Sequence, residues 1–158
     1  MKTLTIIGGA NGAGKTTFAE QFTKDKSLSF LNADKIAKKL EDKGISNANF
    51  KAGRIFFQRL AEYIEEEKDF VAESTLSGNY LLKVAKKVKA QGYKIELVYI
   101  FLDSPETCIQ RVRARVLKGG HHIPREDVIR RYYRSFRNVW EGFAPLADKW
   151  WLIYNGSE

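Results

Sequence analysis

Cysteine is almost missing from this sequence. Cys108 is the only one among 158 residues, which excludes an internal disulfide and a zinc site built from several cysteines. A lone cysteine in a protein that is not exported usually packs as a small apolar side chain, and we expect that of Cys108.

Long apolar segments are missing as well. No stretch reaches the roughly 20 apolar residues of a membrane-spanning helix, so we expect no membrane association. The chain enters a short strand-like run without the extended apolar segment of a signal peptide, which predicts a cytoplasmic location. Internal repeats and proline- or glycine-rich linkers are absent, and residues 1–158 are therefore expected to form one domain.

Positive charge is present and unevenly distributed. The net charge is +8, and residues 111–137 contain nine Lys or Arg but two Asp or Glu. A protein that follows a long nucleic acid usually spreads its basic residues over a wide face. Charge confined to one stretch favours a clamp on phosphate groups over a nucleic-acid track.

Apolar periodicity predicts an alternation of strands and helices. Apolar runs predict strands at residues 4–8, 28–34, 70–74, 94–102 and 150–154, and helices at 15–22, 35–43, 48–67, 79–91, 104–118 and 124–140. In the third helix, apolar side chains near helical spacing predict the buried side, namely Phe50, Ile55, Phe56, Leu60 and Ile64. The alternation predicts an α/β fold with a parallel sheet covered by helices on both faces.

The stretch GGANGAGKTT, residues 8–17, matches the phosphate-binding motif G-x-x-x-x-G-K-[ST] (the P-loop). Glycines let backbone N–H groups surround phosphate oxygens, and the following helix adds its positive N-terminal end. The alternative dinucleotide fingerprint needs a third glycine that no register here supplies. We therefore expect ATP with Mg²⁺, the metal on the Thr16 hydroxyl, at Gly9, Ala10, Asn11, Gly12, Ala13, Gly14, Lys15, Thr16 and Thr17.

Two acidic residues lie at the ends of predicted strands, where a parallel sheet places its site. Asp34 could orient an acceptor hydroxyl and accept its proton, or cap the helix predicted at 35–43. Glu73 could bind magnesium through water, hold a substrate hydroxyl, or merely terminate its strand.

The arginines of residues 111–137 are predicted to form a helical lid. Arg111, Arg115 and Lys118 recur at i, i+4 and i+7 on one helix. On the next helix, the side opposite the apolar stripe carries Arg130, Arg131, Arg134 and Arg137. Between them, KGGHHIP offers a glycine hinge, with His121 and His122 as lid residues. Guanidinium groups suit phosphate oxygens, although a solvated helix face is the alternative for each arginine.

These segments together resemble the zeta-toxin-like P-loop kinases, especially the branch labelled predicted ABC-type ATPases. The matching pieces are GGANGAGKTT, LNADKIA, FVAESTLSG, RVRARVLKGGHHIP and RRYYRSFRN. The resemblance implies a three-layer P-loop NTPase fold with strand order 2-3-1-4-5. It also implies ATP-dependent phosphorylation of a hydroxyl of UDP-N-acetylglucosamine or another nucleotide sugar, with a small antitoxin protein as partner. The GGHHIP segment belongs to the predicted-ATPase branch, so the identity of the acceptor stays open.

The resemblance also assigns roles to individual residues. Lys15 would bind phosphate, Thr16 would bind magnesium and Asp34 would act as general base. Glu73 and Thr75 would contact the substrate, and Arg115 with one of Arg131 or Arg134 would clamp the transferring phosphate. Of these two we take Arg131 as the clamp and Arg134 as a substrate contact, and Arg111 joins the predicted ATP-binding residues.

Two other functions stay open at this stage. One is a nucleic-acid-linked NTPase or polynucleotide kinase that uses the basic stretch as a backbone groove, and it predicts salt-sensitive oligonucleotide binding. The other is a module that binds ATP without turning it over.

Overall fold

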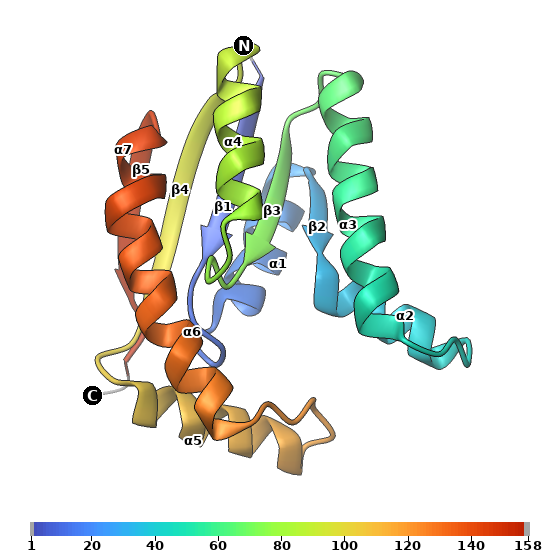
Figure 1. The fold of residues 1–158 in the computed structure, drawn as a ribbon, viewed down its shortest axis with the longest axis vertical. Coiled ribbons are helices and arrows are strands. Elements are labelled where there is room, and N and C mark those ends of the chain that lie inside the picture. Colours follow the sequence, from blue (N-terminus) through green and yellow to red (C-terminus); the bar gives the residue numbers. More distant parts are fainter. Residues whose placement is uncertain (1, 157–158) are drawn as a thin grey trace.

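Five parallel strands form a single sheet in the computed structural model, which describes residues 2–156 (Figure 1). The strands lie in the order β2-β3-β1-β4-β5. Their bounds are β1 Thr3–Gly8, β2 Ser29–Asn32, β3 Phe70–Ser74, β4 Lys94–Phe101 and β5 Lys149–Tyr154. The predicted α/β fold and strand order are confirmed. Met1 and residues 157–158 of the predicted domain lie outside the described part.

Helices cover both faces of the sheet (Figure 1). They are α1 Lys15–Lys26, α2 Ala33–Asp42, α3 Ala48–Glu65, α4 Tyr80–Ala90, α5 Pro105–Leu117, α6 Arg125–Asn138 and α7 Ala144–Leu146, with a π-helical segment at Val139–Phe143. Side chains alternate between the faces of a strand, so Leu4 and Ile6 of β1 pack with α2, α3 and α4. Ile7 packs on the other face with α1 and α5.

Most predicted elements agree with the structure, but several boundaries differ. The first helix, predicted to end at Phe22, continues to Lys26. The second strand ends at Asn32 instead of Asp34, because the Asn32 side chain accepts a hydrogen bond from Lys35 N and caps α2. The helix that begins after Pro124 does not stop at Trp140, since a π-helical segment and α7 continue it.

The buried side of α3 also differs from the prediction. Phe56 and Leu60 are buried, whereas the Phe50 side chain is 71% exposed. Phe50 lies six positions before Phe56, which turns it about 240° away from it around the helix. Apolar spacing alone predicted that Phe50 and Phe56 share the buried side of this helix.

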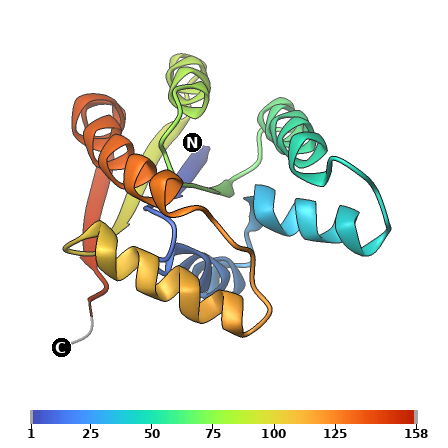
Figure 2. The same cartoon turned by 60° about the horizontal axis from the view of Figure 1, so that its bottom comes forward.

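The strand ends define where a ligand can bind. All five strands run in the same direction, so their carboxyl ends meet at one edge of the sheet, which we call the carboxyl edge. The loop between β1 and α1 lies at this edge, with α5 and α6 beside it (Figure 2). Within residues 2–156, no helix combines the length and apolar character that crossing a bilayer requires.

Candidate active site

The glycine loop between β1 and α1 is held by two close backbone approaches. A Cβ at Gly9 would collide with the Ile100 carbonyl oxygen of β4. A Cβ at Gly12 would lie 2.7 Å from the Cys108 carbonyl oxygen of α5, and Gly12 has a φ of +83°. Glycine at these positions therefore lets β4 and α5 pack directly against the loop.

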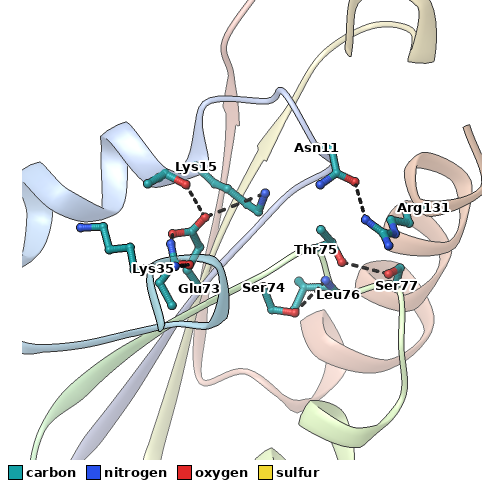
Figure 3. A network of polar contacts seen from close by, with 11 residues as sticks. Asn11, Lys15, Lys35, Glu73, Ser74, Thr75, Leu76, Ser77 and Arg131 are labelled. Carbon is teal, nitrogen blue, oxygen red and sulfur yellow. Dashed lines mark hydrogen bonds and ion pairs between the residues drawn. The ribbon is translucent and has the colours of Figure 1, made fainter. Parts of the chain in front are cut away.

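A buried polar network lies beneath the loop (Figure 3). Thr16 Oγ1 donates to Glu73 Oε1 at 2.6 Å, and Asn32 Nδ2 donates to Glu73 Oε2 at 2.5 Å. Lys15 Nζ lies 3.9 Å from Glu73 Oε1. Glu73 thus joins the ends of β2 and β3 to the start of α1, and its carboxylate contacts the loop.

Lys15 is the centre of a group of charges. Burial lowers the pKa of its ammonium, while the carboxylates of Glu73 and Asp34 act to raise that pKa. Arg115 and Arg131 act to lower it. These four charged groups, from β3, α2, α5 and α6, are therefore close enough to Lys15 to affect its titration. The negative phosphates of a bound nucleotide would favour the charged lysine.

Glu73 has the opposite shift. Burial raises the pKa of its carboxyl, and the nearby Asp34 carboxylate adds to the rise. Lys15 and the hydrogen bonds from Thr16 and Asn32 counteract it. Lys15 and Glu73 therefore hold their charges at a cost in desolvation free energy. A highly charged ligand bound beside them would change that cost.

Asp34 occupies a different place from the one expected. It lies in the first turn of α2 instead of at the end of β2, and Asn32 provides the cap that Asp34 was considered for. Its side chain is exposed at the carboxyl edge. The exposed carboxylate is close enough to Lys15 to act on the pKa of its ammonium.

Arg131 reaches the loop from α6. Its Nη1 donates to Asn11 Oδ1 at 3.3 Å, and Figure 3 shows the side chain pointing from the helix toward the loop. Thr75 lies nearby in the β3–α4 loop, with its Oγ1 2.9 Å from Ser77 Oγ. Arg134 follows one turn later on α6 and is exposed. Arg130, in contrast, pairs with Asp127 of its own helix.

Arg111 and Asn155 hold the other side of the loop. Arg111 Nη2 donates to the Asn155 carbonyl oxygen at 2.7 Å, and Asn155 Nδ2 donates to the Ala13 carbonyl oxygen at 2.9 Å. Sequence reasoning missed Asn155 and Asn32 as site residues. For Asn32 a signal existed, because Asn before a helical run is a preferred cap. Asn155 carried none, since its contact spans 142 positions.

The second half of α6 is held by three hydrogen bonds, one to β4 and two to the segments that directly follow β4 and β3. Tyr132 donates to the Leu102 carbonyl at 2.8 Å, Ser135 Oγ lies 3.1 Å from Tyr99 Oη, and Asn138 Nδ2 donates to the Leu76 carbonyl at 2.8 Å. This half of the predicted lid is therefore anchored to the segments around β3 and β4. His121 in that connection lies 3.5 Å from Glu41 of α2 instead of facing the loop.

The residues around Thr16 suit a magnesium ion that is shared with phosphates. Thr16 gives its hydroxyl proton to Glu73, which leaves its oxygen lone pairs for a metal. Among residues 2–156, His, Cys, Asp and Glu side chains form no group of three that could hold a metal. Water and phosphate oxygens would therefore complete the coordination, as Mg²⁺ prefers.

Comparison with known families decides the class of this site. The model of AAA_33, an AAA domain, matches residues 4–139. The chain belongs to the AAA_33 family. The family is P-loop kinase-like, and the matched range includes the glycine loop, the Glu73 network and the whole of α6. No zeta-toxin family model matches.

Two curated relatives extend over most of the AAA_33 chain. An uncharacterized protein of Haemophilus influenzae is 34% identical over 125 residues, covering 79% of this chain and 88% of its own. A cytidylate kinase of Archaeoglobus fulgidus is 27% identical over 158 residues, covering 94% of this chain and 81% of its own.

Solved structures share the fold at low sequence identity. A putative kinase from Chloroflexus aurantiacus has a TM-score of 0.71 at 15% identity, covering 97% of this chain and 88% of its own. A structure of the PezAT chromosomal toxin–antitoxin system of Streptococcus pneumoniae has a TM-score of 0.70 at 16% identity, covering 98% and 69%. At these identities the likeness is one of fold.

Proposed function

We propose that this AAA_33 chain is an ATP-dependent phosphotransferase of zeta-toxin type, which moves the γ-phosphoryl group of ATP to a hydroxyl of a small molecule. The contact between Arg131 and Asn11 carries the proposal, because it sets a guanidinium group of α6 against the phosphate loop. A nucleotide sugar such as UDP-N-acetylglucosamine is the first acceptor to test, and an antitoxin that covers the site belongs to the same proposal.

Each residue of the site has a separate role in phosphoryl transfer. Lys15 and the loop N–H groups hold the ATP phosphates, and Asp34 orients the acceptor hydroxyl and takes its proton. The acceptor oxygen forms a bond to the γ-phosphorus while the bond from that phosphorus to the ADP oxygen breaks. Arg115 and Arg131 stabilise the charge on the transferring group. A bound Mg²⁺, held by Thr16, would neutralise charge on the phosphates.

The test is the transfer of label from γ-labelled ATP to a panel of nucleotide sugars, nucleosides and nucleotides, with Asp34→Asn measured alongside. We expect a loss in kcat on the order of 10²–10⁴ for a hydroxyl acceptor, which must lose a proton. Asp42→Asn, at the other end of α2, is the matched control and should keep full activity.

Other outcomes lead to other functions. Undiminished transfer by the Asp34→Asn variant would contradict the role of Asp34 as general base. It would point to an acceptor without a proton to lose, such as a phosphate. Labelled oligonucleotides, bound with a steep salt dependence, would indicate a polynucleotide kinase. ATP binding without transfer to any acceptor would leave a nucleotide-binding module.

A further inference from the structure

A groove of about 540 Å³ opens between two helices on the side of the molecule away from α5. It is lined by Asn49, Phe50, Gly53, Arg54 and Phe57 of α3, and by Tyr80, the first residue of α4. We call it the aromatic groove. The groove is shallow and open to solvent, with a volume in the range of small-molecule sites.

Three aromatic side chains form its wall. Phe50 is 71% exposed and Tyr80 59% exposed. The rings of Phe57 and Tyr80 meet edge to face at a centroid distance of 4.3 Å. Phe57 in turn contacts the buried Phe56 at 5.0 Å, which ties this wall to the core. Phe50 and Tyr80 are exposed and Phe57 holds the Tyr80 ring in place, so this wall offers a stacking surface for another flat ring.

Gly53 keeps the groove open in the middle of α3. Nothing lies within 4 Å of the position that its Cβ would occupy, so neither packing nor a close backbone approach requires glycine here. A glycine inside a helix costs about 0.5–1 kcal/mol relative to alanine. A side chain here would project into the groove between Phe50 and Phe57.

Arg54 supplies a positive charge at the same place. It is exposed, and no carboxylate within residues 2–156 forms an ion pair with it. It lies four positions after Phe50 and three before Phe57, so all three share one side of α3. A planar guanidinium beside aromatic rings suits an anion that is attached to a flat ring.

The topology places the groove on the same edge as the phosphate loop. α3 precedes β3 and runs back from the carboxyl edge, so its first half, Asn49 to Phe57, lies toward that edge (Figure 1). Tyr80 follows the β3–α4 loop, and Ser74 at the end of β3 pairs in register with Gly8 at the start of the glycine loop. α2, which carries Asp34, packs against α3.

We propose that the aromatic groove binds the acceptor, and that the acceptor is a nucleotide whose base stacks on Phe50 and Tyr80 while its phosphate pairs with Arg54. The role as acceptor rests on the proposed function, whereas the binding of a nucleotide does not. A base with an attached phosphate is common to nucleoside phosphates and nucleotide sugars.

The experiment measures binding by calorimetry with the glycine loop saturated by a non-hydrolysable ATP analogue and Mg²⁺. The probes are cytidine 5′-monophosphate, UDP-N-acetylglucosamine, cytidine (which lacks phosphate) and ribose 5-phosphate (which lacks the base). Phe50→Leu and Tyr80→Leu should each weaken both nucleotides and the nucleoside about tenfold, because each removes a stacking surface. Arg54→Gln should weaken the nucleotides about tenfold and leave cytidine unchanged.

Matched variants test whether the effects are local. Arg59→Gln on the same helix and Trp150→Leu on β5 replace exposed residues outside the groove, and both should bind like the original protein. The inference is overturned if neither nucleotide binds, or if both bind equally well to the three groove variants. If the groove variants bind both nucleotides normally and label transfer persists, the groove is excluded but the proposed function is retained. If the groove variants weaken nucleotide binding but no acceptor is phosphorylated, the groove is retained as a nucleotide site and the proposed phosphotransferase function is excluded.

Discussion

At the scale of single residues, the site depends on a buried carboxylate that three groups contact. Glu73 is held by Thr16, Asn32 and Lys15, and burial still dominates the pKa of its carboxyl, which is raised. Cys108, beside the loop, has a thiol whose pKa burial raises to about 11, so it stays protonated near neutral pH. That agrees with packing as its only role.

The raised pKa of Glu73 predicts a pH dependence of stability. The folded protein holds this proton to a higher pH than the unfolded chain, so its stability falls as the pH rises from the unfolded pKa through the folded one. Glu73→Gln should therefore gain stability relative to the original protein over the pH interval that begins at the unfolded pKa of the glutamate and ends at its raised folded pKa. Urea denaturation of both proteins without nucleotide checks this. A difference that stays constant over the interval would show that the carboxyl titrates normally.

At the scale of elements, α5 and the glycine loop constrain each other through Gly12. Its φ of +83° is a conformation that side chains rarely adopt, and the Cys108 carbonyl of α5 occupies the space beside it. The same helix carries Arg111 and Arg115, so a shift of α5 would displace the arginine expected to bind ATP and the one expected to clamp the transferring phosphate.

Gly12→Ala should lower both stability and nucleotide affinity. The left-handed conformation costs alanine about 1–2 kcal/mol, and relief of the contact with Cys108 moves α5 away from the loop. We expect a Tm lower by about 2–8 °C and ATP affinity reduced about tenfold or more. Gly44→Ala is the control, because Gly44 has a φ of +74° with nothing within 4 Å of its absent Cβ. If Gly44→Ala weakens ATP binding equally, the approach of α5 is not the cause.

At the scale of the whole molecule, the site is enclosed from two sides. α5 and α6 bring arginines to the loop, while α2 and α3 bring Asp34 and the aromatic groove (Figure 2). His121 of the α5–α6 connection contacts Glu41 of α2 and so joins the two sides. Because α6 is anchored to β4 through Ser135 and Tyr99, closure is expected in the connection and not in the whole lid.

Removal of the lid arginines tests this arrangement. Arg115→Ala and Arg131→Ala should each lower turnover on the order of 10³ or more while changing nucleotide affinity less, since they act on the transferring group. Steady-state phosphoryl transfer and ATP binding measure the two effects, with Arg137→Ala as the control on the exposed side of α6. Near-full turnover in both variants would remove these arginines from the mechanism.

Much of the fold and the nucleotide loop could be predicted from local pattern. The glycine loop is recognisable because its chemistry comes from backbone groups and spacing over ten consecutive residues. Asp34 was assigned to the wrong element because Asn32 and Asp34 are both good caps, and only the hydrogen bond to Lys35 decides between them. Arg130 and Arg131 were equivalent by periodicity, and the packing of α6 on the sheet separated them.

The sequence by itself determined the α/β alternation, the phosphate loop and the concentration of arginine in one stretch, because these are properties of neighbouring residues. The tertiary structure alone decided that Asn155 holds the loop, that Arg131 reaches Asn11 and that Phe50 faces solvent beside Tyr80. Each of these depends on the rotation and docking of a helix or strand against distant segments. Such placement results from packing over the whole sheet, which no local pattern encodes.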